Sequence, residues 1–242
     1  MVSHKNSHEF FYVYLAFKKS DDFFYYMDSR EGKDVQKPRN QNLVVLGLIA
    51  FGIGMRVLPY VLQRLGLISL TDPVTFAWNI SPVPAMCLLG GAYFSARWAG
   101  LGLGLIAYLF SDLLIAGVSG QPAFALYRTL PFVYAGFVLH GVIGLSLRGK
   151  VSAARVGVTA LASEIAFFLL TNFGEWAVGD MNYEKSPAGL MACFVAALPF
   201  LSRSIYGTLI YSAIFFEVAA AVERRSTASG ELVKAPVPTD KR

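Results

Sequence analysis

The chain has 242 residues, of which 55% are hydrophobic and 15% are charged, and its mean hydropathy is +0.50. Soluble domains contain about 45–50% apolar and about 25% charged residues, because their surfaces must be covered with polar groups. The composition therefore excludes an ordinary cytosolic enzyme and a disordered protein. With only two cysteines, it also excludes a secreted disulfide-rich scaffold. We predict an all-α membrane protein that crosses the bilayer several times.

The charge distribution divides the chain into a polar leader, an apolar middle and a polar tail. Residues 1–42 and 222–242 hold most of the charge, and we expect both segments to be disordered and cytoplasmic. Two alternatives stay open for residues 1–26: translation starts at Met27, or the segment lies on the membrane surface. Residues 43–221 are predicted to form a six-helix transmembrane domain.

Six apolar stretches in the middle of the chain are candidates for crossing a bilayer, which takes about 20 residues in a helix. The second stretch is short and starts at Pro82 and Pro84, residues that suit the first turn of a helix. The last is too long for one straight crossing, so we expect Pro199 to break it into a short helix, 188–199, and a second helix from 204. The six stretches are 43–62, 82–96, 98–118, 130–147, 156–172 and 188–221.

Lys and Arg residues are distributed unevenly between the two sides of this arrangement. With six crossings, the termini and the two loops on their side hold 16 of the 21 Lys and Arg residues, against three in the other loops. Because basic loops stay in the cytoplasm, both termini are predicted to be cytoplasmic, with the protein in the inner (plasma) membrane. The basic loops also explain the net charge of +5 without a nucleic-acid partner.

Polar side chains from several predicted helices and loops fall at a similar depth on the outer side. Charged groups inside a bilayer are costly, so Arg56 and Asp112 need a reason to be there. Converging polar groups among apolar and aromatic side chains are typical of a small-molecule site, in which an arginine binds an anionic group and a tryptophan stacks on a ring. The predicted ligand-binding residues are Arg56, Trp78, Asn79, Asp112, Arg128, Asn172 and Trp176.

Structural roles are the alternatives for the same residues. Arg56 and Asp112 can form an ion pair that only joins two helices, and the tryptophans can belong to an interfacial aromatic belt. A further pair, His140 and Glu164, falls near the middle of the membrane at a rise of 1.5 Å per residue. This pair either relays protons or holds adjacent helices together.

Small residues four apart allow close helix packing, which is their default role within a bundle. In the first helix, Ala50 and Gly54 are also candidates for a face that docks a partner subunit. No signature of catalysis, metal binding or nucleotide binding occurs in the sequence. We therefore expect no enzymatic activity, catalytic residue, cofactor or metal site, and any ATPase that drives transport must be another chain.

Several motifs resemble an uncharacterised family of bacterial integral-membrane proteins, known only as a domain of unknown function. They cover about residues 50–217 and include Arg56-Val-Leu-Pro59, Asn79-Ile-Ser-Pro82, Ser111-Asp112-Leu and Thr171-Asn-Phe-Gly-Glu-Trp176. More distantly, the layout resembles the substrate-binding S components of energy-coupling-factor (ECF) vitamin transporters. That likeness implies outer loops that cap a vitamin-sized ligand, with Asn79, Arg128, Asn172 and Trp176 on the ligand side. It also implies a transmembrane coupling subunit that contacts Ala50 and Gly54 and works with separate ATPases.

The leading hypothesis is a substrate-binding membrane subunit that takes up a small polar or anionic molecule from outside through an ECF-type transporter. One alternative is a self-contained secondary transporter coupled to protons through His140 and Glu164. Another is a membrane scaffold without transport activity. The expected partners are the lipid bilayer, the small-molecule ligand, and a coupling subunit with its ATPases.

Overall fold

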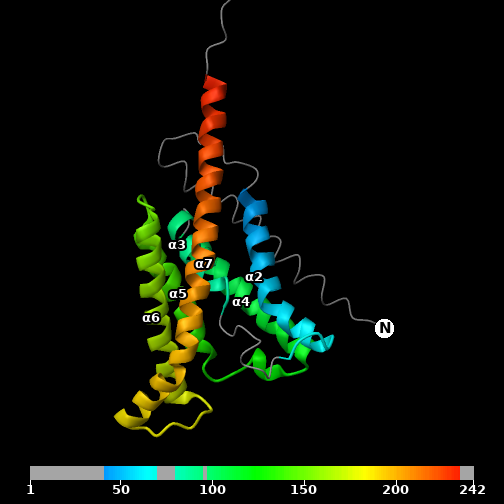
Figure 1. Ribbon diagram of the computed structural model, residues 1–242, viewed down its shortest axis with the longest axis vertical. Coiled ribbons are helices and arrows are strands. Elements are labelled where there is room, and N and C mark those ends of the chain that lie inside the picture. Colours follow the sequence, from blue (N-terminus) through cyan, green and yellow to red (C-terminus); the bar gives the residue numbers. More distant parts are fainter. Residues whose placement is uncertain (1–40, 70–79, 95–96, 235–242) are drawn as a thin grey trace, which may run out of the picture. The chain divides into compact units, whose positions relative to one another are not determined.

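The computed structural model describes residues 41–69, 80–94 and 97–234, which form helices and no strand. The chain divides into two compact units, residues 1–44 and residues 45–242, and the second unit is described below. Apart from the first turn of α2, it contains all the described helices (Figure 1). They are α2 (Gln41–Arg64), α3 (Val83–Tyr93), α4 (Arg97–Ser119), η2 (Pro122–Phe124), α5 (Leu130–Gly144), η3 (Leu145–Leu147), α6 (Ala153–Val178) and α7 (Pro187–Lys234).

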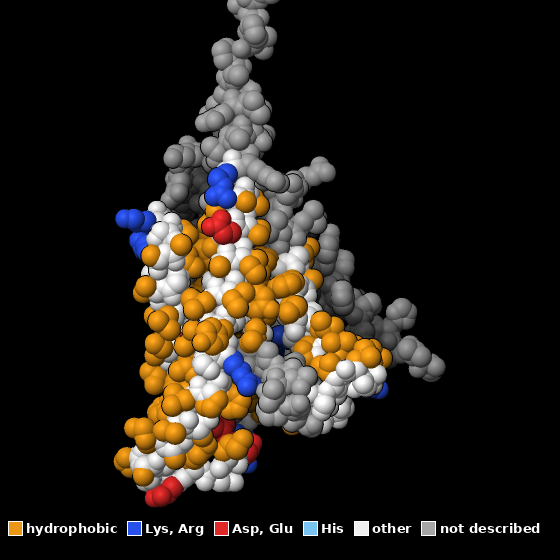
Figure 2. All heavy atoms as spheres, in the orientation of Figure 1, with side chains coloured by type: hydrophobic (Ala, Val, Ile, Leu, Met, Phe, Trp, Pro, Cys, Tyr) orange, Lys and Arg blue, Asp and Glu red, His pale blue; other side chains and the backbone are white. Residues whose placement is uncertain are grey.

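Five of the described helices are long and apolar enough to cross a membrane. These segments are Leu46–Arg64, Leu101–Ser119, Leu130–Leu147, Ala153–Val178 and Pro187–Val222. Large hydrophobic side chains on them are exposed, and Figure 2 shows such side chains over most of the visible helix surface. An apolar surface of this extent is stable in lipid rather than in water. The chain is therefore an all-α, multi-pass membrane protein, as predicted from its composition.

The short helix α3 forms the core of the unit. It packs against α4, α5 and α7, and its residues from Val83 to Gly91 are all buried. Pro82 is the N-cap and Pro84 lies in the first turn, where a proline costs no helical hydrogen bond. With 11 residues, α3 is shorter than the predicted stretch 82–96 and shorter than a straight crossing requires.

Arg148 holds the other end of α3. Its Nε donates to the carbonyl oxygen of Gly91 at 2.8 Å, and its Nη2 donates to that of Phe94 at 2.5 Å. Carbonyl groups at the end of a helix lack partners within the helix, so a buried helix end needs donors from elsewhere. A single arginine from the segment after α5 therefore caps the central helix.

Glycines bring the backbones of α3 and α5 into contact. A Cβ atom on Gly91 would overlap the carbonyl oxygen of Gly141, and one on Gly144 would overlap the backbone of Leu88. Such close approach is a feature of helix packing in membranes. The small residues of α5 therefore pack within the bundle, the default role expected for them.

We expect Gly91→Ala to lower the free energy of unfolding by about 1–3 kcal/mol, the usual cost of overpacking a core. Unfolding in mixed micelles measures this change. The matched control is Gly47→Ala on α2, where an added Cβ atom meets nothing within 4 Å. Equal stability of the two variants would contradict the close packing of α3 on α5.

The structure departs from the predicted boundaries mainly in the last helix. α7 runs without a break through Pro199, so the predicted break there is wrong. Backbone groups left without hydrogen bonds are costly in lipid, which favours a continuous helix, and the Ser202 hydroxyl donates to the Pro199 carbonyl at 2.9 Å. α7 then continues through residues 222–234 (red in Figure 1), for which the sequence predicts a disordered tail. The leader, residues 1–40, lies outside the described residues.

Candidate functional site

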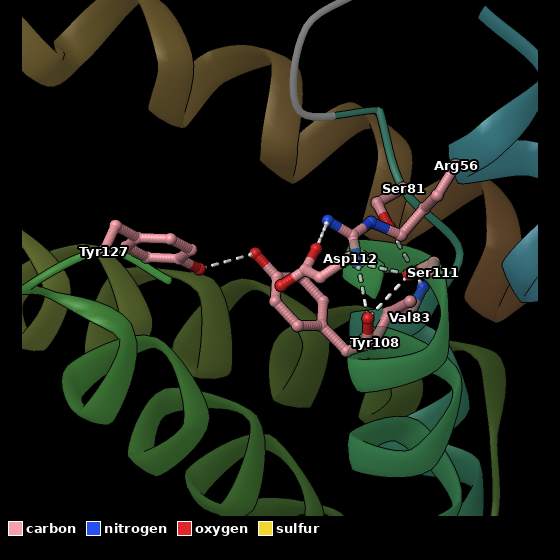
Figure 3. Close-up of polar contacts among 7 residues, drawn as sticks. All are labelled: Arg56, Ser81, Val83, Tyr108, Ser111, Asp112 and Tyr127. Atoms are coloured by element: carbon pink, nitrogen blue, oxygen red, sulfur yellow. Dashed lines mark hydrogen bonds and ion pairs between the residues drawn. The ribbon is translucent and has the colours of Figure 1, made fainter. Parts of the chain in front are cut away.

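A first polar cluster joins α2 to α4 around the guanidinium group of Arg56 (Figure 3). Nη1 donates to the Ser111 hydroxyl at 2.5 Å and to the Tyr108 carbonyl at 3.1 Å. Nη2 donates to Asp112 Oδ1 at 2.7 Å. The guanidinium carbon also lies 3.6 Å from the centroid of the Tyr108 ring, a cation–π contact. The Arg56 side chain is 16% exposed and that of Asp112 is 3% exposed, so the two predicted charges form a buried ion pair.

The sequence of α4 explains why one helix supplies all of these partners. Tyr108 and Ser111 are three residues apart, and Tyr108 and Asp112 are four apart, which places the three side chains on one face. The Ser111 hydroxyl also donates to the Tyr108 carbonyl at 2.7 Å. One helical face therefore presents an aromatic ring, a hydroxyl and a carboxylate to Arg56.

The same cluster contains buried polar atoms without hydrogen-bond partners. Asp112 Oδ2 and the Tyr134 hydroxyl are buried, and neither has a hydrogen-bond partner in the described part of the chain. The Tyr134 ring packs edge-on against that of Tyr108, with centroids 5.9 Å apart. Hydrogen-bonding capacity therefore remains beside the ion pair.

A third tyrosine joins the cluster from the loop between η2 and α5. The hydroxyl of Tyr127 lies 3.2 Å from that of Tyr108 (Figure 3). Burial raises the pKa of Tyr127 above its ordinary value, so the phenol keeps its proton through neutral pH. The loop thus adds a neutral hydroxyl to the carboxylate and phenols of α4 and α5.

The structure places two other predicted ligand-binding residues in separate contacts. Arg128 forms an ion pair with Asp180 at 3.4 Å, and their side chains are 72% and 74% exposed. The Asn172 side chain donates to the Phe168 carbonyl of its own helix at 2.8 Å. Neither residue is hydrogen-bonded to the Arg56 cluster in the described part of the chain.

Trp176 at the end of α6 is hydrogen-bonded to the loop between α6 and α7. Its Nε1 donates to the Glu184 carbonyl at 2.8 Å, while Lys185 Nζ donates to the Trp176 carbonyl and lies 5.5 Å from its ring. These contacts favour a structural role for Trp176. Trp78 and Asn79, the remaining predicted ligand-binding residues, lie outside the described residues.

A second polar cluster lies in the interior, where α5, α6 and α7 meet. Glu164 Oε2 accepts a hydrogen bond from Ser204 Oγ and Oε1 accepts one from Thr208 Oγ1, each at 2.5 Å. His140 Nε2 lies 3.7 Å from Glu164 Oε1, and the imidazole ring stacks on Phe167 with centroids 5.2 Å apart. The predicted pair of His140 and Glu164 is therefore adjacent, and α7 adds two hydroxyl groups to it.

Sequence reasoning missed the hydroxyl groups of both clusters. Ser204, Thr208 and Ser212 recur every four residues along α7, which is the spacing of one helix face. Tyr108 likewise precedes Asp112 by four residues. These spacings in the sequence indicate that the side chains share a helix face. The contact of Tyr127 joins a loop to a helix, and no periodicity in the sequence predicts it.

The small-residue face of α2 points away from the bundle. Ala50 is exposed, and an added Cβ atom at Gly47 or Gly54 would meet nothing within 4 Å. On another face of α2, the Phe51 ring contacts Tyr211 and Phe215 of α7, with centroids 6.0 Å apart in both pairs. Within the described residues, Ala50 and Gly54 are therefore not used to pack this bundle.

Within residues 41–69, 80–94 and 97–234, no three His, Cys, Asp or Glu side chains gather in an arrangement that could hold a metal ion. Both polar clusters offer hydrogen-bonding groups; the first contains the ion pair of Arg56 and Asp112, and the second contains the adjacent side chains of His140 and Glu164.

Comparison with known proteins gives a family match over most of the chain. The model described as "Family of unknown function (DUF6580)" matches residues 36–230. No curated protein and no solved structure matches the chain. The expected likeness to an uncharacterised family is confirmed. The likeness to ECF-type S components stays a prediction.

Proposed function

This chain belongs to the DUF6580 family of unknown function, and we propose that it is a substrate-binding membrane subunit that captures a small polar molecule for uptake. The observation that carries the proposal is Asp112 Oδ2, a buried carboxylate oxygen without a hydrogen-bond partner in the described part of an apolar bundle. Leaving a buried acceptor unsatisfied costs about 1–3 kcal/mol, and more for a charged group. This cost favours the binding of a group that donates a hydrogen bond.

The contacts of Arg56 point to the chemical class of the ligand. Its two terminal nitrogens already donate to three oxygens of the protein, and its charge neutralises that of Asp112. The contacts therefore favour a ligand that donates hydrogen bonds to the protein over a ligand that is bound through a negative charge. Hydroxyl, amide or ammonium groups are complementary to Asp112 Oδ2, and the rings of Tyr108 and Tyr134 supply apolar surface beside it.

The route of uptake is part of the proposal. The basic loops favour an outward orientation for the α4–α5 connection, which brings the Arg56 cluster near the outer face of the plasma (inner) membrane. The exposed face formed by Gly47, Ala50 and Gly54 suits close approach of a helix from a coupling subunit. Separate ATPases would then drive release to the cytoplasm, as in an ECF-type transporter.

The ligand class can be tested with matched probes on the purified full-length protein. Primary amides, primary amines and carboxylic acids of the same carbon skeleton are compared by their effect on thermal unfolding. We expect the amides or amines to raise Tm and the acids to leave it unchanged, because a ligand at about 100 times its Kd adds about 2.7 kcal/mol of stability.

Two aspartate variants complete this experiment. Asp112→Asn should abolish the shift in Tm. The side-chain oxygen of the asparagine can still accept the hydrogen bond from Arg56, but its NH2 group, a donor, replaces Oδ2, the acceptor proposed to bind the ligand. Asp180→Asn is the matched control, since Asp180 also pairs with an arginine but is 74% exposed. A shift produced only by the acids, or one that persists in Asp112→Asn, would contradict the proposed site.

A further inference from the structure

The interior cluster encloses two ionisable side chains almost completely. The side chain of His140 is 0% exposed and that of Glu164 is 1% exposed. Within the described residues, His140 is the basic side chain that lies beside the Glu164 carboxylate, 3.7 Å away. Ionisable groups inside a bilayer are costly and mark ion or proton pathways more often than other residues do. A net charge on His140 and Glu164 would therefore be costly at this position.

Glu164 and His140 differ in their hydrogen bonds. Both oxygens of Glu164 already accept hydrogen bonds from α7, whereas neither nitrogen of His140 has a partner in the described part of the chain. The 3.7 Å between His140 Nε2 and Glu164 Oε1 is too long for a hydrogen bond. A hydrogen bond would require the two side chains to move closer together. One hydrogen atom between these two atoms would satisfy the nitrogen and join α5 to α6.

We propose that His140 and Glu164 together form a binding site for one exchangeable proton. Without it, a neutral imidazole and a carboxylate leave a net charge of −1 buried among apolar side chains. The proton comes from hydronium in the surrounding water: one O–H bond of hydronium breaks, a water molecule is left, and an O–H bond forms on Glu164 Oε1, directed at His140 Nε2, with no bond broken in the protein. The pair is then neutral overall. This site is independent of the proposed ligand site at Asp112.

Within the described residues, no Lys or Arg side chain forms an ion pair with Glu164. From α3, Cys87 is a buried free cysteine, and an ordinary thiol is neutral at neutral pH. From α7, Ser204 and Thr208 contribute neutral hydroxyls. Arg203, beside Ser204 in the sequence, has an interaction of its own. The pair therefore gains neutrality by binding a proton.

Protonation also changes how three helices are joined. As a carboxylate, Glu164 accepts from both α7 hydroxyls, which links α6 to α7. With the proton between Glu164 Oε1 and His140 Nε2, this oxygen is hydrogen-bonded both to Thr208 and to the imidazole. Glu164 then joins α5 as well as α7 to α6. Proton binding is thereby coupled to the packing of α5 and α7 on α6.

Infrared difference spectroscopy of the full-length protein in liposomes tests this site directly. Changing the pH of the bathing buffer should produce a carbonyl band of a protonated carboxylic acid, which shifts in heavy water because the proton exchanges. The band should be lost completely in Glu164→Gln. It should persist in the matched control Glu217→Gln, because Glu217 is 78% exposed and pairs with Arg224 instead.

A second measurement covers the case in which variants at this buried site do not fold. The nitrogen resonances of His140 in the isotopically labelled wild-type protein should change with pH at the same midpoint as the carboxylic-acid band. His140→Asn, if folded, should keep the band and move its midpoint. The proposal is overturned if no band depends on Glu164 at any pH, or if the His140 resonances do not follow it. It is also overturned if the band responds to sodium ions at fixed pH but not to pH.

Discussion

Replacing Arg56 with alanine should lower the free energy of unfolding by about 3–5 kcal/mol, the usual cost of removing one partner of a buried ion pair. The change removes three hydrogen bonds and the cation–π contact with Tyr108. It also leaves the Asp112 carboxylate, whose side chain is 3% exposed, without a compensating charge. Reversible unfolding in mixed micelles measures the loss.

Two further variants separate the ion pair from a general effect of mutating α2. Arg56→Met combined with Asp112→Leu should recover most of the stability, because apolar residues of similar volume often replace a buried pair without loss. Arg64→Met should cost less than about 1 kcal/mol, because Arg64 also donates to α4, at the Val118 carbonyl, but is exposed. If Arg56→Ala also lowered the free energy of unfolding by less than about 1 kcal/mol, the result would contradict a stabilising ion pair between Arg56 and Asp112.

Replacing Arg148 with methionine should cost about 3–6 kcal/mol, because each of its two hydrogen bonds involves a charged donor and contributes about 1.5–3 kcal/mol. The carbonyls of Gly91 and Phe94 would lose these donors at the end of the central helix. Hydrogen exchange should speed up in α3, and mixed-micelle unfolding gives the total loss. Lys150→Met, an exposed position two residues further on, is the control. Equal stability of the two variants would show that Arg148 does not hold α3 in place.

Much of the fold could be predicted because hydropathy is a local property of the sequence. Runs of apolar residues identified the membrane segments, and the prolines at 82 and 84 identified the start of α3. The course of α7 through Pro199 could not be predicted in this way. It depends on the cost of unpaired backbone groups in lipid, which outweighs the local preference of proline for a helix break.

The candidate site was predictable where charge occurs in apolar sequence. This criterion identified four residues: Arg56, Asp112, His140 and Glu164. In the structure Arg56 lies beside Asp112 and His140 lies beside Glu164. One of the two alternatives stated for each pair was this kind of contact between helices. Depth in the membrane does not specify which way a residue faces, so Arg128 and Asn172 were grouped with Arg56 but have other partners. Tyrosine and serine are common in such sequences, and their roles depend on which helices meet.

Native mass spectrometry of the full chain, released gently from the membranes of its own host, tests the capture of a small molecule most directly. The proposed function predicts one small-molecule adduct on the 26.4 kDa chain. The adduct should be absent from Asp112→Asn and retained in Asp180→Asn. The mass of the chain alone, or lipid adducts that are the same in both variants, would contradict a ligand site at Asp112.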